Sequence, residues 1–76
     1  MKFIVHTGPG CVQCKQTIRR IEAKGGTVEL YDAEQPEFEQ YFGSRQLPGV
    51  IAVDIRGVAK ESWTGFRPDK IDHYLK

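Results

Sequence analysis

Residues 3–14 read FIVHTGPGCVQC and contain, in order, the signals of a strand, a turn and the start of a helix. The β-branched and aromatic side chains of Phe3-Ile4-Val5 predict a buried strand over residues 2–6. Gly8-Pro9-Gly10 ends this strand, because its glycines permit unusual backbone angles and its proline fixes its own. A helix is expected to begin at Cys11. Both cysteines of the chain therefore lie where a strand passes into a helix.

The residues that follow supply the other elements of an α/β domain. Gly25-Gly26 ends the first helix, and a strand over residues 27–31 comes next, in which apolar and polar residues alternate. Further along we expect a helix over residues 36–43, strands over 50–55 and 58–63, and a helix that begins at Pro68. The strand over 58–63 is the weakest of these, because its Lys, Glu and Ser residues are poor strand formers.

The predicted order of elements is β-α-β-α-β-β-α, within one domain that covers residues 1–76. The first βαβ unit places two strands parallel to each other, joined by the first helix. The last two strands are expected to form an antiparallel hairpin. The fold class is therefore α/β with a mixed sheet.

Composition and charge argue against several classes of protein. The chain has 76 residues with 11 basic and 10 acidic side chains, which gives a formal net charge of +1. This near-neutral balance argues against a nucleic-acid binder and against a polybasic membrane patch. The longest apolar run, Val50-Ile51-Ala52-Val53, is far shorter than the ~20 residues of a membrane span. The N-terminus lacks the layout of a signal peptide, and two cysteines are too few for a disulfide-stapled secreted scaffold, so we expect a cytoplasmic protein.

The two cysteines, Cys11 and Cys14, have the spacing of a redox-active pair. The free N–H groups and the dipole at a helix N-terminus favour a thiolate at Cys11, and the thiolate is the nucleophile. Cys14 lies one helical turn further on, within reach of the first sulfur. We therefore expect Cys11 to attack a substrate disulfide and Cys14 to resolve the mixed disulfide, which leaves a Cys11–Cys14 disulfide.

Two alternatives to redox chemistry remain open at this point. Two cysteines can be inert, buried apolar residues. The pair can also bind zinc or an iron–sulfur cluster, although such a site needs about four ligands and the chain has no second pair. In that alternative a cluster would be shared between two chains. For one chain we expect no bound metal.

Pro48 is the second chemical marker, since it precedes a strand that is expected to pair inside the sheet. A cis bond between Leu47 and Pro48 would leave the backbone groups of Leu47 free to pair with an extended substrate segment. An ordinary trans proline in a turn is the alternative.

Three stretches make the chain resemble the NrdH-redoxins, glutaredoxin-like members of the thioredoxin fold. Cys11-Val12-Gln13-Cys14 matches the active-site tetrapeptide of that family, and Gln46-Leu47-Pro48 falls at its cis-proline. The third stretch, residues 63–69, reads WTGFRPD and is close to the family signature W-S-G-F-R-P-D. The resemblance covers nearly the whole chain, and the third stretch is its most specific part.

This resemblance implies a fold, an activity and partners. The fold is a four-stranded mixed sheet flanked by three helices. Cys11 is the attacking cysteine, Cys14 is the resolving one, and a cis Pro48 borders the substrate groove. Electrons come from NADPH through thioredoxin reductase and pass to a disulfide in the catalytic subunit of class Ib ribonucleotide reductase. The protein is then an electron carrier with protein-disulfide reductase activity and no bound cofactor, and a monomer in the cytoplasm of a bacterium or of a virus-infected host.

The resemblance also suggests which residues touch the substrate or partner proteins, in addition to the two cysteines. They are Val12, Gln13, Leu47, Pro48, Gly49, Trp63, Gly65, Phe66 and Arg67. For Trp63 and Phe66, packing in the core or under a loop is an equally expected role.

The chain departs from the family and from ordinary glutaredoxins at three places. Gly8 stands where a lysine is common, so a glutathione carboxylate loses a cationic partner. Gly65-Phe66-Arg67 replaces the paired glycines and acidic residue that glutaredoxins use for glutathione. Gly49 follows Pro48, where a β-branched residue is common, and is expected either to loosen the groove wall or to let a partner backbone approach closely. A glutathione-dependent glutaredoxin therefore stays as an alternative, but a weakened one.

Overall fold

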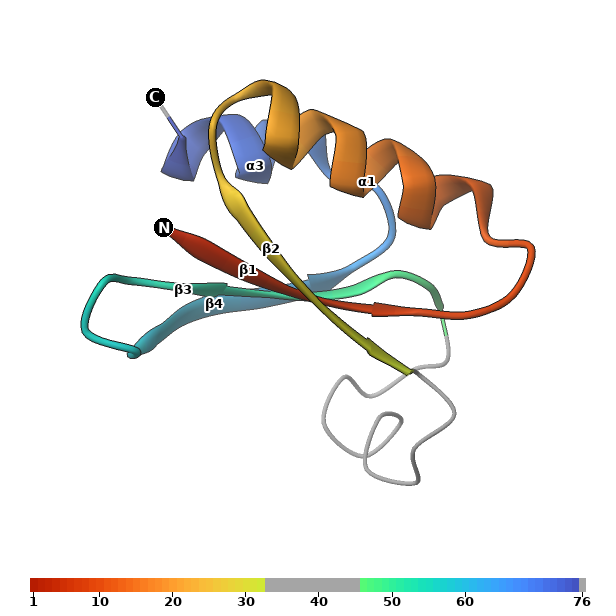
Figure 1. Ribbon diagram of the computed structural model, residues 1–76, viewed down its shortest axis with the longest axis horizontal. Coiled ribbons are helices and arrows are strands. Elements are labelled where there is room, and N and C mark those ends of the chain that lie inside the picture. The colour runs from red at the N-terminus through yellow and green to blue at the C-terminus, as the bar shows by residue number, and fades with distance from the viewer. Residues whose placement is uncertain (33–45, 76) are drawn as a thin grey trace.

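The computed structural model describes residues 1–32 and 46–75, which form four strands and two helices (Figure 1). Along the chain these are β1 (Lys2–Thr7), α1 (Val12–Ala23), β2 (Thr27–Asp32), β3 (Gly49–Val53), β4 (Ala59–Thr64) and α3 (Pro68–Tyr74). The helix expected over residues 36–43 lies outside the described residues. No described helix is long and apolar enough to cross a membrane.

The strands form the predicted four-stranded mixed sheet, and their order across it is β2-β1-β3-β4. β1 pairs with β2 in parallel, with Val5 opposite Leu30, and with β3 in antiparallel, with Val5 opposite Val50. β3 and β4 form the expected antiparallel hairpin. Figure 1 shows α1 and α3 side by side on the same face of this sheet. The carboxyl end of β1, from which the chain passes into α1, therefore lies in the middle of the sheet.

The core lies between this face of the sheet and the two helices. Alternate residues of the central strands point into it, which is the spacing of two that a half-buried sheet requires. Its fully or nearly buried members are Phe3, Val5, Ile21, Val50, Ala52, Trp63 and Ile71. The helix α1 ends as predicted, because Gly25 has a φ of 82° and the N–H groups of Gly25 and Gly26 bond to the last carbonyls of the helix.

β3 is shorter than the strand expected over residues 50–55, because Asp54 starts a turn. Its carboxylate accepts hydrogen bonds from the N–H groups of Val58 at 3.0 Å and Arg56 at 2.9 Å. These bonds, that from Val58 first, lower the pKa of the Asp54 carboxyl. Gly57, with a φ of 83°, completes the turn. Ile55 is therefore at the tip of the hairpin and 94% exposed.

The weak strand β4 forms because its partners compensate for its poor propensity. It pairs with β3, and its Glu61 accepts hydrogen bonds from Lys70 and from the hydroxyl of Tyr74, both on α3. α3 is also joined to α1, since Arg20 donates to the Asp72 carboxylate at 2.9 Å. These contacts fix α3, and with it the turn over residues 65–67 that precedes it.

Candidate active site

The turn after β1 places Cys11 immediately before the first residue of α1. Gly10 has a φ of 71°, a left-handed conformation that glycine adopts without strain. Cys11 is the N-cap of α1, with extended backbone angles. Its sulfur is joined to that of Cys14 in a disulfide, with a Cα–Cα distance of 5.3 Å. The pair that the spacing predicted is therefore assembled in the structure.

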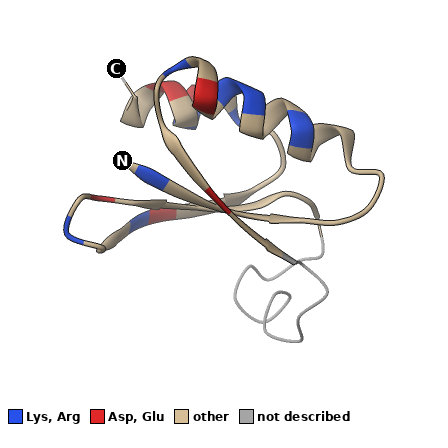
Figure 2. Cartoon of the chain, viewed as in Figure 1, with Lys and Arg blue, Asp and Glu red and all other residues tan. Residues whose placement is uncertain are grey.

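The environment of the Cys11 sulfur favours negative charge. The N–H of Cys14 lies 3.1 Å from this sulfur and donates to it. The first turn of α1 holds no acidic residue, and Figure 2 shows basic residues along the helix. When the disulfide is reduced, the same N–H and the helix dipole stabilise a thiolate at Cys11.

The two cysteines differ in access to solvent. Cys11 is partly exposed, whereas Cys14 is only 3% exposed. Val12, between them, is 67% exposed, and Gln13 is also exposed. A disulfide from outside can therefore reach the Cys11 sulfur far more easily than that of Cys14. This difference agrees with the roles of attacking and resolving cysteine that the sequence suggests.

The side chain of Gln13 connects the cysteine pair to the turn before α3. Its Oε1 accepts a hydrogen bond from the N–H of Phe66 at 3.3 Å, across 53 residues of sequence. The N–H of Gly65 donates to the carbonyl of Pro48 at 2.8 Å. The three stretches that carried the resemblance, far apart in the sequence, thus meet at one end of the sheet.

The segment before β3 forms one wall of this site. The peptide bond between Leu47 and Pro48 is cis, as the resemblance implies. Pro48 is fully buried, and Leu47 is partly exposed. A Cβ added to Gly8 would lie 2.8 Å from Cδ1 of Leu47. Leu47 therefore packs directly against Gly8, at the position where a lysine is common in glutaredoxins.

Among the residues expected to touch a partner, Trp63 and Gly49 are buried, as are Pro48 and Gly65. Trp63 is 7% exposed, because its strand position turns it toward the core, where it packs against Phe3 and Tyr74. Gly49 is buried within the sheet, between His6 of β1 and Thr64 of β4. For Trp63 the packing role is confirmed, and neither Trp63 nor Gly49 presents a surface for direct contact.

The remaining residues of the signature have mixed positions. Gly65 is buried, and Phe66 is partly buried and packs on the core cluster. Arg67 is exposed and donates two hydrogen bonds to the Asp69 carboxylate, at 3.0 and 3.2 Å. The bond from Arg67 lowers the pKa of the Asp69 carboxyl, which lies at the start of α3. Arg67 is thus accessible to a partner.

Gln46 and Thr64 also belong to this site, although the sequence analysis did not name them as site residues. The hydroxyl of Thr64 donates to Oε1 of Gln46 at 3.5 Å. Gln46 also lies against Gly65, with Nε2 at 2.9 Å from the position of an added Cβ. A signal was available for both, since Gln46 directly precedes Leu47 and Thr64 lies within the signature stretch.

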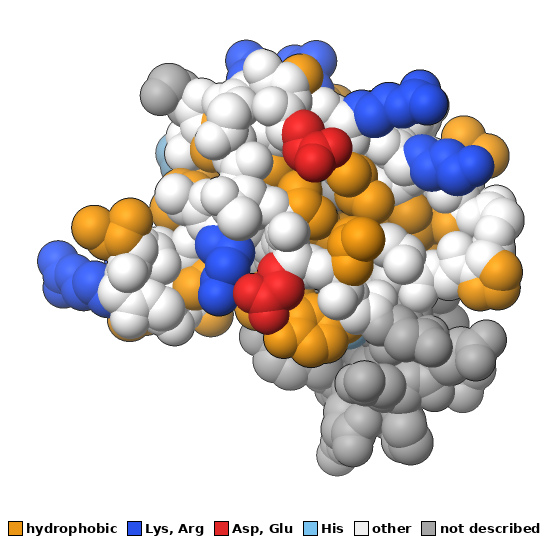
Figure 3. All heavy atoms as spheres, viewed as in Figure 1, with side chains coloured by type: hydrophobic (Ala, Val, Ile, Leu, Met, Phe, Trp, Pro, Cys, Tyr) orange, Lys and Arg blue, Asp and Glu red, His pale blue; other side chains and the backbone are white. Residues whose placement is uncertain are grey.

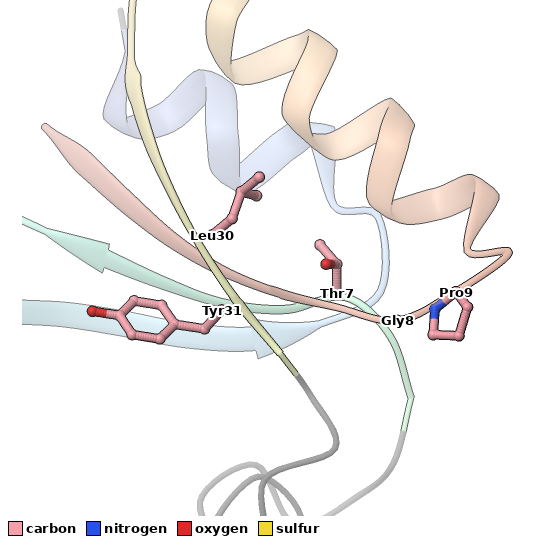
Figure 4. A pocket seen from close by; sticks show the side chains of 5 residues that line it. All are labelled: Thr7, Gly8, Pro9, Leu30 and Tyr31. Carbon is pink, nitrogen blue, oxygen red and sulfur yellow. The ribbon is translucent and has the colours of Figure 1, made fainter.

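A pocket lies between the active-site turn and the end of β2 (Figure 4). It has a volume of about 350 Å³ and is lined by Thr7, Gly8, Pro9, Leu30 and Tyr31. Leu30 and Tyr31 are 59% and 40% exposed, and Figure 3 shows apolar side chains at the surface where α1 faces β2. Among the described residues, no group of three or more His, Cys, Asp or Glu side chains is placed to hold a metal ion.

Replacing Gly65 by alanine is expected to lower both stability and activity. Gly65 has a φ of 84°, and a left-handed alanine costs about 1–2 kcal/mol in folding free energy. The added Cβ would also push against Gln46 and disturb the wall of the site. Gly57→Ala is a matched control, because Gly57 has a φ of 83° but open space around it.

Denaturant unfolding and disulfide-reduction kinetics on both variants test this prediction. Both variants should lose similar stability, and only Gly65→Ala should raise the KM for a disulfide substrate. Equal kinetics for the two variants would show that the packing of Gly65 has no part in substrate binding.

The comparisons with known proteins agree with this geometry. No family model matches the chain. The glutaredoxin-like protein NrdH of Escherichia coli K12 is 40% identical in an alignment 76 positions long, and the alignment covers 95% of this chain and 86% of that protein. NrdH of Salmonella typhimurium is 37% identical over the same shares. The SPbeta prophage-derived thioredoxin-like protein YosR of Bacillus subtilis is 30% identical over 100% of this chain and 96% of its own length.

A solved structure resembles the whole arrangement. The structure of the glutaredoxin-like protein NrdH-redoxin from Escherichia coli matches with a TM-score of 0.75 and 38% sequence identity. The match covers 96% of this chain and 93% of that one. The thioredoxin-like fold with a four-stranded mixed sheet is therefore confirmed.

Proposed function

Because this chain belongs to the NrdH family of glutaredoxin-like proteins, we propose that it carries electrons to a class Ib ribonucleotide reductase. In this proposal it is a small dithiol–disulfide oxidoreductase that reduces a disulfide in the catalytic subunit. Thioredoxin reductase returns it to the dithiol form at the expense of NADPH. It works in the cytoplasm as a monomer and holds no cofactor of its own.

One observation carries the proposal: the Cys11–Cys14 disulfide lies at the N-terminus of α1. Cys11 is partly exposed and its sulfur accepts a hydrogen bond from the N–H of Cys14, whereas Cys14 is buried beside it. This arrangement supports a reaction in which the first sulfur exchanges with an outside disulfide and the second sulfur releases the product.

The reaction proceeds in two exchanges. The Cys11 thiolate attacks one sulfur of the substrate disulfide, a Cys11–substrate bond forms, and the other substrate sulfur leaves and takes a proton. Cys14 then loses its proton and attacks the Cys11 sulfur, so the Cys11–Cys14 bond forms and the second substrate thiol leaves. Two electrons have passed to the substrate. The protein then needs two electrons from its reductase.

The site offers little for glutathione, which supports thioredoxin reductase as the source of electrons. A glutathione carboxylate would need a cation beside the active-site turn. Gly8 supplies none, and the side chain of Leu47 fills the space next to it. In the opposite wall, residues 65–67, two backbone N–H groups are already used. That of Gly65 donates to the carbonyl of Pro48, and that of Phe66 donates to Oε1 of Gln13.

Oxidation of NADPH in two coupled assays tests the proposal. The protein and a disulfide substrate are supplied either with thioredoxin reductase or with glutathione and glutathione reductase. Turnover only with thioredoxin reductase is expected, and Cys11→Ser should abolish it. The same pair of proteins should then support deoxyribonucleotide formation by a class Ib ribonucleotide reductase without added dithiothreitol.

Two results would overturn the proposal. Turnover only with glutathione would make the protein a conventional glutaredoxin, despite Gly8. A coloured dimer that loses its colour with a chelator, and does not reduce disulfides, would indicate an iron–sulfur carrier that uses the same cysteines.

A further inference from the structure

The hydroxyl group of Thr17 is buried without a partner. Thr17 lies in α1 and is 0% exposed, and its Oγ1 makes no hydrogen bond to any part of the chain that the structure describes. A threonine in a helix ordinarily donates to the carbonyl three or four residues earlier, but Thr17 does not. Valine has the same shape and no hydroxyl to bury. An unpartnered buried hydroxyl therefore needs an explanation outside the packing of this disulfide form.

Thr17 shares the buried face of α1 with the resolving cysteine. Cys14, Thr17 and Ile21 are the buried residues of the helix, at spacings of three and four. Residues three apart on a helix are neighbours, and helical side chains lean toward the N-terminus, so the side chain of Thr17 leans toward Cys14. Threonine also has two accessible χ1 rotamers in a helix, which allows its hydroxyl to turn without moving the backbone.

The need of Cys14 for a hydrogen-bond donor changes during the reaction. In the disulfide its sulfur is neutral and bonded to Cys11. Before the resolving step it must become a thiolate, in a position that is only 3% exposed. Water has little access there, and the nearby N–H of Cys14 points at the Cys11 sulfur. A buried anion without a donor is strongly disfavoured, so the resolving step requires one.

We propose that the hydroxyl of Thr17 donates a hydrogen bond to the Cys14 thiolate during the resolving step. This proposal rests on the dithiol mechanism above and assigns a donor to its second exchange. Cys14 loses its proton, receives the bond from Thr17, and attacks the Cys11 sulfur of the mixed disulfide. The Cys11–Cys14 bond forms, the Cys11–substrate bond breaks, and the substrate leaves as a thiolate that takes up the proton. Thr17 is then left without a partner, as the disulfide form has it.

The reaction of the reduced protein with the chromogenic disulfide of thionitrobenzoate tests this role. One thionitrobenzoate is released when Cys11 attacks, and a second when Cys14 resolves the mixed disulfide. In stopped flow at a pH below the apparent pKa of the second phase, Thr17→Val should leave the first phase unchanged and slow the second. Thr17→Ser, which keeps the hydroxyl, should restore the second phase. Thr27→Val, at an exposed position of β2, is the matched control and should change neither phase.

The pH profile of the second phase separates a hydrogen bond from a packing effect. Without the donor, the apparent pKa of this phase should rise by about one unit. Below that pKa the thiolate fraction falls about tenfold, but a more basic thiolate is intrinsically about threefold more reactive, so the rate falls only about threefold. At a pH above both apparent pKa values, Thr17→Val should resolve faster than the wild type. The two profiles should therefore cross.

Each result has a clear meaning. Crossing profiles with rescue by serine support the donor role, and the disulfide form of Thr17→Val should be at least as stable as the wild type in denaturant. Equal second phases in Thr17→Val and the wild type would overturn the role, as would equal slowing by valine and serine. Absence of the second thionitrobenzoate in the wild type would instead refute the two-cysteine mechanism itself.

Discussion

Replacing Cys14 by serine is expected to stop the reaction at the mixed disulfide. Cys11 keeps its partial exposure and its position at the start of α1, so the first exchange proceeds. No second thiol is then present to release the product. Steady-state turnover of a protein disulfide should fall by at least about two orders of magnitude, the loss typical of removing an essential nucleophile.

The trapped intermediate gives this prediction a direct measurement. Cys14→Ser mixed with an oxidised protein substrate should form a covalent adduct on a non-reducing gel, which dithiothreitol dissolves. Cys11→Ser should form none, because the buried Cys14 sulfur is not accessible to the substrate. Full turnover by Cys14→Ser would mean that an outside thiol performs the second exchange, and the two-cysteine mechanism would be wrong.

The loss of turnover expected for Cys14→Ser cannot be explained by a loss of folding stability when the disulfide is absent. The disulfide closes a loop of only four residues, so in the chain-entropy model it contributes about 2 kcal/mol to folding. The wild type also lacks this bond when it is reduced. Cys14→Ser should therefore unfold close to the denaturant concentration of the reduced wild type, lowered only by the cost of burying a serine hydroxyl at a position that is 3% exposed, and this comparison is the control for folding.

Local signals predicted most of the fold. Gly8-Pro9-Gly10 and Gly25-Gly26 mark the ends of elements by backbone conformation alone, and in the structure the first separates β1 from α1 and the second separates α1 from β2. The predicted end of β3 at residue 55 was wrong, because the apolar Ile55 resembles a strand residue. Its neighbour Asp54 binds two N–H groups of the turn with its carboxylate, and this side-chain preference outweighs the apolar pattern.

The site could be predicted only in part. The cysteine pair is a local pattern, and its spacing and position were sufficient. The bond from Phe66 to Gln13 and the approach of Gly65 to Gln46 join residues that are distant in the sequence, so no spacing rule predicts them. The side of the sheet on which Trp63 lies depends on its pairing with Val50, which the sequence does not state.

Replacing Trp63 by alanine is expected to damage folding rather than partner binding. The ring of Trp63 lies edge-on to Phe3 and stacked on Tyr74, both at 6.4 Å between centroids, with Nζ of Lys70 at 5.7 Å. Removing a buried tryptophan typically costs about 3–5 kcal/mol. Since small domains have only about 5–15 kcal/mol of stability, this is a large fraction of the total. Denaturant unfolding of the oxidised protein measures it.

Two further variants separate packing from contact within the same signature stretch. Trp63→Phe keeps an aromatic ring on Tyr74 and should recover much of the stability and all of the disulfide-reductase activity per folded molecule. Arg67→Ala removes an exposed side chain, so it should leave the unfolding midpoint unchanged and raise the KM for thioredoxin reductase or the substrate protein. If Trp63→Phe instead folds like the wild type and loses activity, a partner must reach the tryptophan by opening the core, and its burial would not describe the bound state. If Arg67→Ala has normal kinetics, the role of the signature stretch is to position α3 and the turn before it. The partner would then contact the exposed residues Val12 and Gln13 instead.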